Sequence, residues 1–194
     1  MAAPAPAPQQ TSNDLSKGCQ PVIFVFARGS TEPGNMGYLV GPQTCTALKK
    51  GGGVACQGVG GAYTASIMDN VSTLGTTQAA INEAKKTFSN AAKKCPDAKI
   101  VFGGYSQGAA VMHGAVSSLE AGLKEKVVGG VLYGDTRNQE DKGQIPNYPK
   151  EAVKIFCRSD DGVCGAGLSV TAGHLAYGSD VNAAVQFLRQ RIGK

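Results

Sequence analysis

Short runs of apolar residues alternate along this chain with longer segments in which apolar positions recur every three or four residues. Residues 22–27, Val-Ile-Phe-Val-Phe-Ala, form an unbroken apolar run rich in β-branched and aromatic side chains. Such a run is typical of a strand that is buried on both faces. Similar runs predict three further strands, over Ile100–Phe102, Val127–Tyr133 and Val153–Phe156.

Amphipathic segments separate these strands. Within Thr77–Lys94 the apolar side chains recur at helical spacing and the lysines lie on the opposite side, as in a helix that packs on a sheet. Helices are also predicted over Gln107–Leu123 and Val181–Arg191. Strands that alternate with helices predict an α/β fold with a central parallel sheet. In such sheets, functional sites lie at the carboxyl ends of the strands.

The chain has 194 residues, of which 42% are hydrophobic and 17% charged, as in a single globular domain. We expect this domain over residues 17–194, preceded by a disordered Ala/Pro-rich tail over residues 1–16. The net charge of +5 includes no run of five or six like charges, so no nucleic-acid partner is indicated. No apolar stretch approaches the ~18 residues of a transmembrane segment.

Six cysteines without a Cys-x-x-Cys pair favour three disulfides in a secreted, extracellular protein. The alternative is a cytosolic protein with reduced cysteines. Six cysteines allow about fifteen pairings, which the sequence alone does not resolve. Proximity along the chain suggests Cys45–Cys56 and Cys157–Cys164, and this leaves Cys19–Cys95.

A Gly-x-Ser-x-Gly pattern centred on Ser106 follows one predicted strand and begins one predicted helix. A strand-to-helix turn this sharp strains the serine backbone, and only glycine fits two residues to either side. The turn presents the hydroxyl above the sheet, beside a helix N-terminus that stabilises negative charge. Ser106 is therefore the candidate nucleophile, and an ordinary tight turn is the alternative.

A serine nucleophile needs a base, and the chain has two histidines. His113 lies seven residues after Ser106 on the same predicted helix, about 10 Å along its axis. We therefore interpret His113 as a surface or helix-packing residue and His174, in a Gly-rich segment, as the base. An acid that orients the base is expected between Ser106 and His174 in the chain. Position after a strand selects Asp135, Asp160 and Asp161. A disulfide between Cys157 and Cys164 would fix the loop of the last two, which favours that loop without separating Asp160 from Asp161.

Several stretches resemble the fungal cutinases, and the likeness extends from about Cys19 to Arg191. The stretches are ARGSTE from Ala27, GGYSQGAA from Gly103, IPNYP from Ile145, FCRSDDGVC from Phe156 and HLAYGSD from His174. The resemblance implies a small lidless α/β-hydrolase, a three-layer α/β/α sandwich with a Ser-His-Asp triad in which Asp161 is the acid. It also implies the Cys19–Cys95 and Cys157–Cys164 disulfides, with Cys45–Cys56 as a third.

The same resemblance assigns an oxyanion hole to Ser30 and Gln107, with Asn70 holding the Ser30 hydroxyl. Asn70 also begins an Asn-Val-Ser sequon, a use that conflicts with this supporting role, and the supporting role is favoured. The substrate crevice is expected to be lined by Ile67, Val71, Tyr105, Leu168, Val170 and Leu175. Ser72 and Ser169 stand where bulkier apolar residues are common in the family, and we expect them to interrupt the crevice.

Together these features predict a secreted serine esterase that acts on cutin-like polyesters and short-chain soluble esters. No metal or cofactor is implied, and the protein is expected to be a monomer. One alternative is an acetylxylan-type esterase, against which the absence of Trp argues weakly. The other is a secreted surface-interaction protein with a degenerate site.

Overall fold

Five parallel strands form one sheet in the computed structural model, which describes residues 9–165, 167 and 169–193. The strands lie in the order β2-β1-β3-β4-β5, so β2 and β5 are the edges. Their bounds are Val54–Gly58 for β2, Val22–Ala27 for β1, Lys99–Tyr105 for β3, Val127–Tyr133 for β4 and Val153–Phe156 for β5. The register aligns Ala27 with Gly104 and Tyr105 with Tyr133, so the loops after β1, β3 and β4 begin at one edge.

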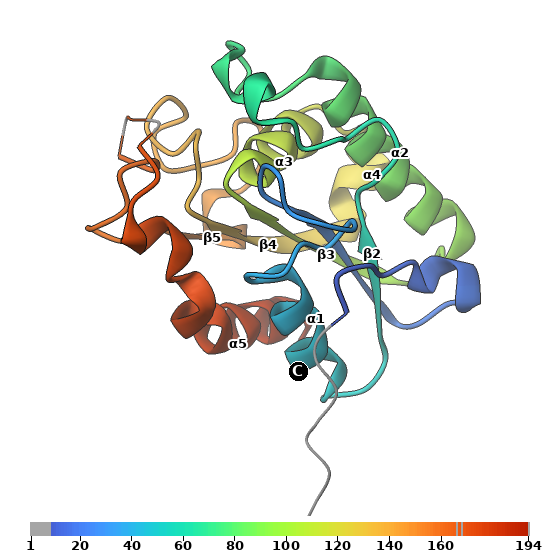
Figure 1. The fold of residues 1–194 in the computed structure, drawn as a ribbon. Helices are drawn as coiled ribbons and strands as arrows, with labels where there is room; N and C mark the ends of the chain where they lie inside the picture. The colour runs from blue at the N-terminus through green and yellow to red at the C-terminus, as the bar shows by residue number, and fades with distance from the viewer. Residues whose placement is uncertain (1–8, 166, 168, 194) are drawn as a thin grey trace, which may run out of the picture.

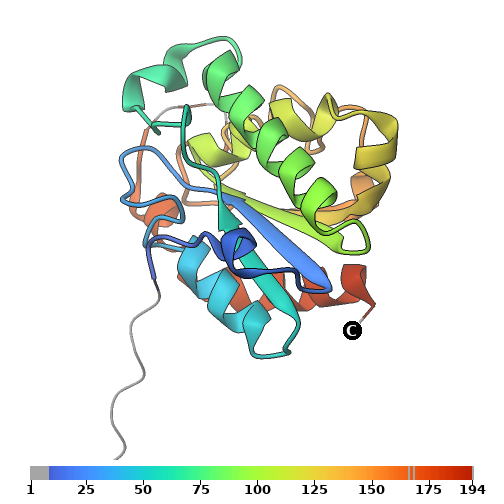
Figure 2. The same ribbon diagram turned by 90° about the vertical axis from the view of Figure 1, so that its right-hand side faces the viewer.

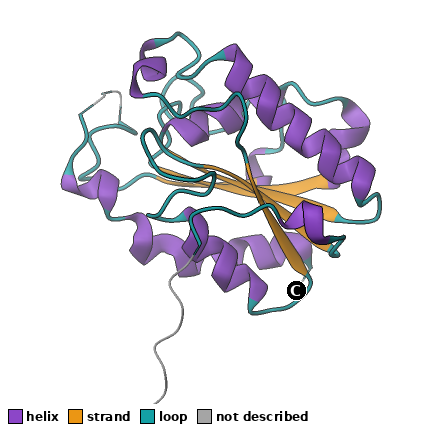
Figure 3. Cartoon of the chain, turned by 45° about the vertical axis from the view of Figure 1, so that its right-hand side comes forward, coloured by secondary structure: helices purple, strands orange, loops and turns teal. Residues whose placement is uncertain are grey.

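Helices cover both faces of this sheet, as Figures 1, 2 and 3 show from three sides. One face carries α1 (Gly41–Lys49) and α5 (Val181–Ile192). The other carries α2 (Gln78–Lys94), α3 (Gln107–Ser117) and α4 (Ala121–Lys126). The predicted α/β fold, a three-layer sandwich with a central parallel sheet, is confirmed.

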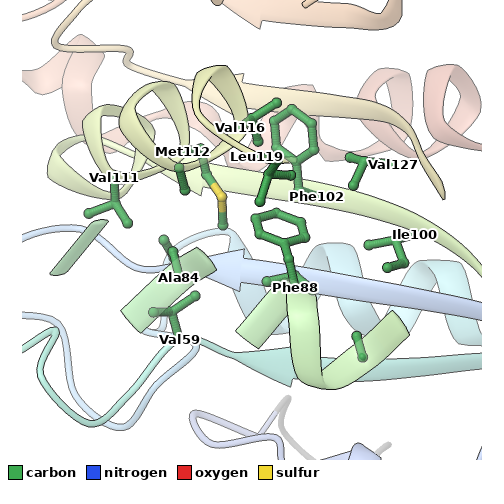
Figure 4. Packing of buried hydrophobic residues seen from close by; sticks show 14 of the residues in the cluster. Val59, Ala84, Phe88, Ile100, Phe102, Val111, Met112, Val116, Leu119 and Val127 are labelled. Carbon is green, nitrogen blue, oxygen red and sulfur yellow. The ribbon is translucent and has the colours of Figure 1, made fainter. Parts of the chain in front are cut away.

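Strand β1 shows why its sequence is apolar at every position. Ile23, Val25 and Ala27 belong to the core beneath α2 and α3. The alternate residues, Val22, Phe24 and Phe26, belong to the core beneath α1 and α5. Within the first core, the ring of Phe88 on α2 meets the ring of Phe102 on β3 edge to face, with centroids 6.3 Å apart (Figure 4).

The helix predicted over Gln107–Leu123 is shorter than expected. It ends at Ser117, and α4 begins at Ala121. The hydroxyls of Ser117 and Ser118 both donate to the carbonyl of Gly114, a contact that competes with helix propagation.

Two elements, α1 and β2, were not predicted from the sequence. The Cys45–Cys56 disulfide joins them. Cys19–Cys95 and Cys157–Cys164 are also bonded, which is the pairing that chain proximity and the resemblance suggested. Within the described part of the chain, no helix combines the length and the apolar character that crossing a membrane requires.

The N-terminal segment belongs to the domain from an earlier residue than expected. A tail was predicted over residues 1–16, but Ser12, Asp14 and Leu15 are buried. Ser12 and Asp14 bind the outer edge of β2: the amide of Cys56 donates to Asp14 Oδ2 (3.0 Å), and the amide of Gly58 donates to the Ser12 carbonyl (2.9 Å). Composition did not reveal this attachment, because it depends on backbone groups and on one buried carboxylate.

Candidate active site

Ser106 lies in the strained strand-to-helix turn that the sequence predicts. It connects β3 to α3 with φ 56° and ψ −122°, and its amide donates to the Tyr133 carbonyl at 3.0 Å. The flanking glycines are required sterically. A Cβ on Gly104 would lie 2.7 Å from the carbonyl oxygen of Gly108, and one on Gly108 would clash with the carbonyl of Ala27.

His174 and Asp161 complete a continuous hydrogen-bonded row with this serine. His174 lies in the 3-10 helix η4 (Ala172–Leu175), and its Nε2 is 2.9 Å from Ser106 Oγ. Its Nδ1 is 2.9 Å from Asp161 Oδ2. His174 and Asp161 are buried, and both Ser106 and His174 line a surface pocket, so the row meets solvent only at its Ser106 end.

The structure separates Asp161 from the other aspartates. Its Oδ1 accepts from the amide of Val163 (2.8 Å), and its Oδ2 also accepts from the hydroxyl of Tyr177 (2.6 Å). Burial acts to raise the pKa of Asp161, but hydrogen bonds from Tyr177, His174 and Val163 outweigh it and hold the pKa below the usual range. The carboxylate therefore stays ionised at neutral pH. Asp160 points elsewhere, toward Arg158 Nε at 3.3 Å.

Two tyrosines that the sequence did not assign to the triad hold its members. Tyr177 binds Asp161 directly, as described above, and accepts from the amide of Arg158 at 3.0 Å. The ring of Tyr105 stacks on that of His174 with centroids 5.1 Å apart, and its hydroxyl donates to the His174 carbonyl at 2.8 Å. The sequence carries no signal for the contact between Tyr177 and Asp161, because only the fold brings this hydroxyl and this carboxylate together.

The Cys157–Cys164 disulfide closes the loop that carries Asp161. Opening it by Cys157→Ser/Cys164→Ser should lower the free energy of unfolding by about 2–4 kcal/mol and lower kcat several-fold, because the loop is then fixed at one root only. Urea unfolding and ester hydrolysis measure the two effects. The matched control is Cys45→Ser/Cys56→Ser, which opens a comparable loop between α1 and β2 and should leave kcat unchanged. Equal kcat values in the two variants would contradict this role of the loop.

A second network fixes the hydroxyl of Ser30. Ser30 Oγ accepts from Asn70 Nδ2 at 2.7 Å and from Gln107 Nε2 at 2.8 Å. Both lone pairs of this oxygen are thereby used, so its own proton is left to donate elsewhere. The fully buried Gln107 is held in turn by Thr76, whose hydroxyl donates to Gln107 Oε1 at 3.0 Å. Thr76 was not predicted from the sequence.

Asn70 uses both of its amide hydrogens inside the protein. One binds Ser30 Oγ, and the other binds the carbonyl of Ile67 at 2.9 Å. A glycan on Nδ2 would replace one of these hydrogens, so the geometry favours the supporting role of Asn70 over glycosylation of its sequon.

If Ser30 is the oxyanion donor that the resemblance implies, Ser30→Ala should lower kcat by about 10²–10³ with little change in KM, because this hydroxyl would act only on charge that develops during the reaction. Steady-state kinetics on a soluble ester measure both constants. Ser66→Ala is the control, since Ser66 contributes its backbone carbonyl to this network and keeps it after the substitution. A Ser30→Ala variant that raises KM and preserves kcat would show that Ser30 binds the ground state instead.

The pocket beside Ser106 has a volume of about 410 Å³ and an apolar rim. Five of the six predicted crevice residues line it, and Leu168 lies outside the described residues. The five are Ile67, Val71, Tyr105, Val170 and Leu175. Met68, Tyr38 and Leu39 also line it and were not predicted. A larger groove of about 710 Å³ lies along α2 and the N-terminal segment, but its lining includes no member of the triad.

Ser72 and Ser169, which we expect to interrupt the crevice, lie outside this pocket, and their effect on the crevice stays a prediction. The hydroxyl of Ser72 donates to the Thr76 carbonyl at 2.6 Å, so it closes a turn of its own segment. Ser72 lines a neighbouring cavity of about 520 Å³, which shares Asn70, Val71 and Thr136 with this pocket.

The second histidine is buried but takes no part in the triad. His113 lies on α3 with its Nε2 2.7 Å from Asp135 Oδ2, and both residues are almost inaccessible. His113 was predicted to be either a surface residue or a helix-packing residue, and its burial excludes the surface position. Across the residues that the structure describes, no group of three or more His, Cys, Asp or Glu side chains is arranged to hold a metal ion.

Comparisons with known proteins agree on one family. The cutinase family model matches residues 18–192. A probable cutinase 3 of Neosartorya fischeri is 52% identical over 99% of this chain and 92% of its own length. Cutinase 1 of Fusarium vanettenii is 46% identical over 93% of this chain and 80% of its own length.

Solved structures show the same relationship. A Trichoderma reesei cutinase in complex with a C11Y4 phosphonate inhibitor matches with a TM-score of 0.83 and 32% identity, over 95% of this chain and 80% of that one. An acetylxylan esterase matches with a TM-score of 0.73 over 91% of this chain and 100% of that one. Its identity is only 20%, so this second likeness shows the fold alone.

Proposed function

Because the chain belongs to the cutinase family and is thus a carboxylic ester hydrolase, we propose that it is a secreted enzyme that cleaves cutin-like polyesters and short-chain soluble esters. Ser106 is the nucleophile, His174 the general base and acid, and Asp161 the residue that orients His174. The observation that carries this proposal is the unbroken row from Ser106 Oγ through His174 to Asp161, with both contacts at 2.9 Å.

In the first half of the reaction, Ser106 Oγ attacks the ester carbonyl carbon while His174 Nε2 takes its proton. The carbonyl oxygen becomes negatively charged and is bound by the backbone amide of Gln107 and by Ser30, through its hydroxyl and backbone amide. The tetrahedral intermediate then collapses. The C–O bond to the alcohol breaks, His174 returns the proton to the leaving oxygen, and an acyl-Ser106 ester remains.

In the second half, water takes the place of the alcohol. His174 accepts a proton from the water as the water oxygen attacks the acyl carbon, and the same donors of Gln107 and Ser30 bind the oxyanion. Collapse releases the carboxylic acid, and the proton goes back to Ser106 Oγ. Asp161 remains ionised throughout and stabilises the His174 imidazolium, which agrees with its lowered pKa.

The pocket supports an aliphatic acyl group as the substrate portion near Ser106. Its rim carries exposed apolar side chains, among them Ile67, Val71 and Val170, with exposed fractions of 60%, 71% and 62%. Side chains of this kind gain free energy when an aliphatic chain covers them. A chain segment of a solid polyester, or a short soluble acyl chain, fits such an open apolar groove.

Secretion and a monomeric state complete the proposal. Three disulfides are typical of proteins that mature in an oxidising compartment. Every side chain of the proposed site comes from one chain, so no second copy is needed for catalysis.

The test is hydrolysis of p-nitrophenyl acetate, butyrate and octanoate, together with release of monomers from a cutin film. We expect turnover of the soluble esters and of the film, with kcat/KM several-fold higher for butyrate than for acetate. Each added CH₂ that becomes buried contributes at most about 0.8 kcal/mol. Turnover of acetate alone would indicate an acetyl esterase. Absence of all turnover would indicate a binding protein with an inactive site.

A further inference from the structure

A buried charged cluster lies directly behind the proposed site. His113 of α3 is 3% exposed and is placed between two carboxylates of the loop that follows β4. Its Nε2 is 2.7 Å from Asp135 Oδ2. Its Nδ1 is 2.7 Å from Asp141 Oδ2, an ion-pair contact whose angle lies outside hydrogen-bond geometry. Arg137 pairs with Asp141 from the other side, at 3.2 Å.

Two carboxylates, each 2.7 Å from a ring nitrogen, favour a charged imidazole. A neutral imidazole has a single N–H and would turn a lone pair toward one of the two carboxylates. Burial alone lowers the pKa of His113, but Asp135 and Asp141 outweigh it and raise the pKa to about 9. Both carboxylates come from the loop after β4, whereas α2, which packs against α3 here, faces Gly114 with the apolar Ile81.

The cluster continues into the walls of the pocket. The amide of Arg137 donates to Asp135 Oδ1 at 2.9 Å, and its guanidinium donates to the Thr73 carbonyl at 2.7 Å. Between the two aspartates lies Thr136, which lines the pocket and approaches the Ser106 carbonyl at 3.5 Å.

Thr73 belongs to the segment that forms the opposite wall. This segment begins with the 3-10 helix η2 (Ile67–Val71), which carries Asn70 and much of the apolar rim. Two hydrogen bonds to other parts of the protein, Thr76–Gln107 and Arg137–Thr73, hold the C-terminal part of residues 67–76. The second of these depends on the loop that His113 holds.

We propose that His113 is a positioning residue for substrate binding: its imidazolium fixes the loop of Asp135 and Asp141, and Arg137 transmits this constraint to the pocket wall over residues 67–76. The inference rests on the proposed ester hydrolysis for its kinetic readout. Loss of the charge should loosen the wall and weaken binding of the acyl chain, while the triad itself stays intact.

The first test compares His113→Gln with the wild type on p-nitrophenyl butyrate at pH 7. We expect KM to rise about three- to tenfold and kcat to change less than twofold. Met112→Ala is the matched control, because it removes a buried side chain of the same helix that belongs to the core beneath α2 and α3. Once assayed below its unfolding temperature, this control should keep both constants. An unchanged KM in His113→Gln would overturn the proposal.

The pH dependence separates positioning from mere stabilisation. The contribution of His113 to stability and to the pocket wall should be complete below about pH 6.5 and lost as pH rises through about 9. The KM of the wild type should therefore rise over this window and approach the value of His113→Gln, whose own KM should stay flat. Parallel pH profiles of the two proteins would overturn the proposal.

Hydrogen exchange gives a readout that needs no activity. In His113→Gln at pH 7, amides of residues 67–76 should exchange faster than in the wild type, while those of β2 should not change. If His113→Gln fails to fold, Asp141→Asn replaces it, since this aspartate is partly exposed and its loss leaves the His113–Asp135 pair. Unchanged exchange over residues 67–76 would overturn the inference, whereas an inactive wild type would refute the proposed function.

Discussion

Ser106→Ala is expected to fold like the wild type and to lose about 10⁶ of kcat. Alanine keeps the β-carbon in the strained turn, so the urea midpoint should shift little, but no oxygen remains to attack the ester carbonyl. Stopped-flow or steady-state hydrolysis of p-nitrophenyl butyrate measures the loss of kcat. A phosphonate ester that labels the wild type should leave the variant unlabelled.

His174→Ala should be about as slow as Ser106→Ala, and the double variant should be no slower than either single variant. Residues that act in one proton transfer lose their effect together. If kcat of the double variant is much lower than that of either single variant, Ser106 and His174 act independently, and the proposed row is not the catalytic unit.

Asp161→Asn is expected to lower kcat by about 10⁴. The amide of asparagine can donate to His174 Nδ1 and so favours the tautomer whose Nε2 carries the proton, which prevents it from accepting one from Ser106. The control is Asp160→Asn, the adjacent and exposed aspartate, whose carboxylate approaches Arg158 at 3.3 Å. Asp160→Asn should keep kcat within about twofold of the wild type.

Asp161→Asn should also change how the free energy of unfolding depends on pH in the acid range. Because the pKa of Asp161 is lowered by folding, its ionised form contributes stability above pH 3.8, and this contribution is lost as pH falls further. The unfolding free energy of Asp161→Asn should therefore depend less steeply on pH in the acid range.

A large loss of kcat in Asp160→Asn with full activity in Asp161→Asn would show that the acid has been assigned to the wrong residue.

Where burial alone decides the structure, the sequence was a sufficient guide. The bounds of β1, β4 and β5 agree with their apolar runs. Strands β1 and β4 are almost entirely buried, whereas the edge strand β5 is only partly covered. Strand β3 is longer than predicted and includes Gly103 and Gly104, residues that normally disfavour strands. The fold uses them for space: a Cβ on Gly103 would lie 2.8 Å from the ring of Phe26.

Elements that depend on partners distant in the chain were not predictable. Strand β2 is five residues long, contains Cys, Gln and Gly, and pairs with β1 alone among the strands. Its strand character follows from pairing with β1, which a local pattern does not contain. The end of α3 at Ser117 was not predictable for a related reason. The hydroxyls of Ser117 and Ser118 form hydrogen bonds to the backbone, and the spacing of apolar residues carries no information about such bonds.

The proposed site divides in the same way. The Gly-x-Ser-x-Gly spacing led to Ser106, and exclusion of His113 led to His174. The structure brings these two side chains into contact, although their catalytic roles stay predictions. Position after a strand left Asp160 and Asp161 equivalent, because adjacent residues differ only in the direction of their side chains. The support from Tyr177 was invisible, since this side chain reaches Asp161 from a neighbouring turn.

The N-terminal segment has a consequence for how the protein behaves at high concentration or on a solid surface. Edge strands with free amides and carbonyls invite pairing with other chains. Here residues 12–14 occupy the outward amides of Cys56 and Gly58, and the Ser12 hydroxyl binds the Cys56 carbonyl at 3.0 Å. The family model begins only at residue 18, yet a protein shortened to that point would retain every proposed catalytic group and expose an aggregation-prone sheet edge. We therefore expect removal of this segment to increase self-association while the proposed catalytic groups stay in place.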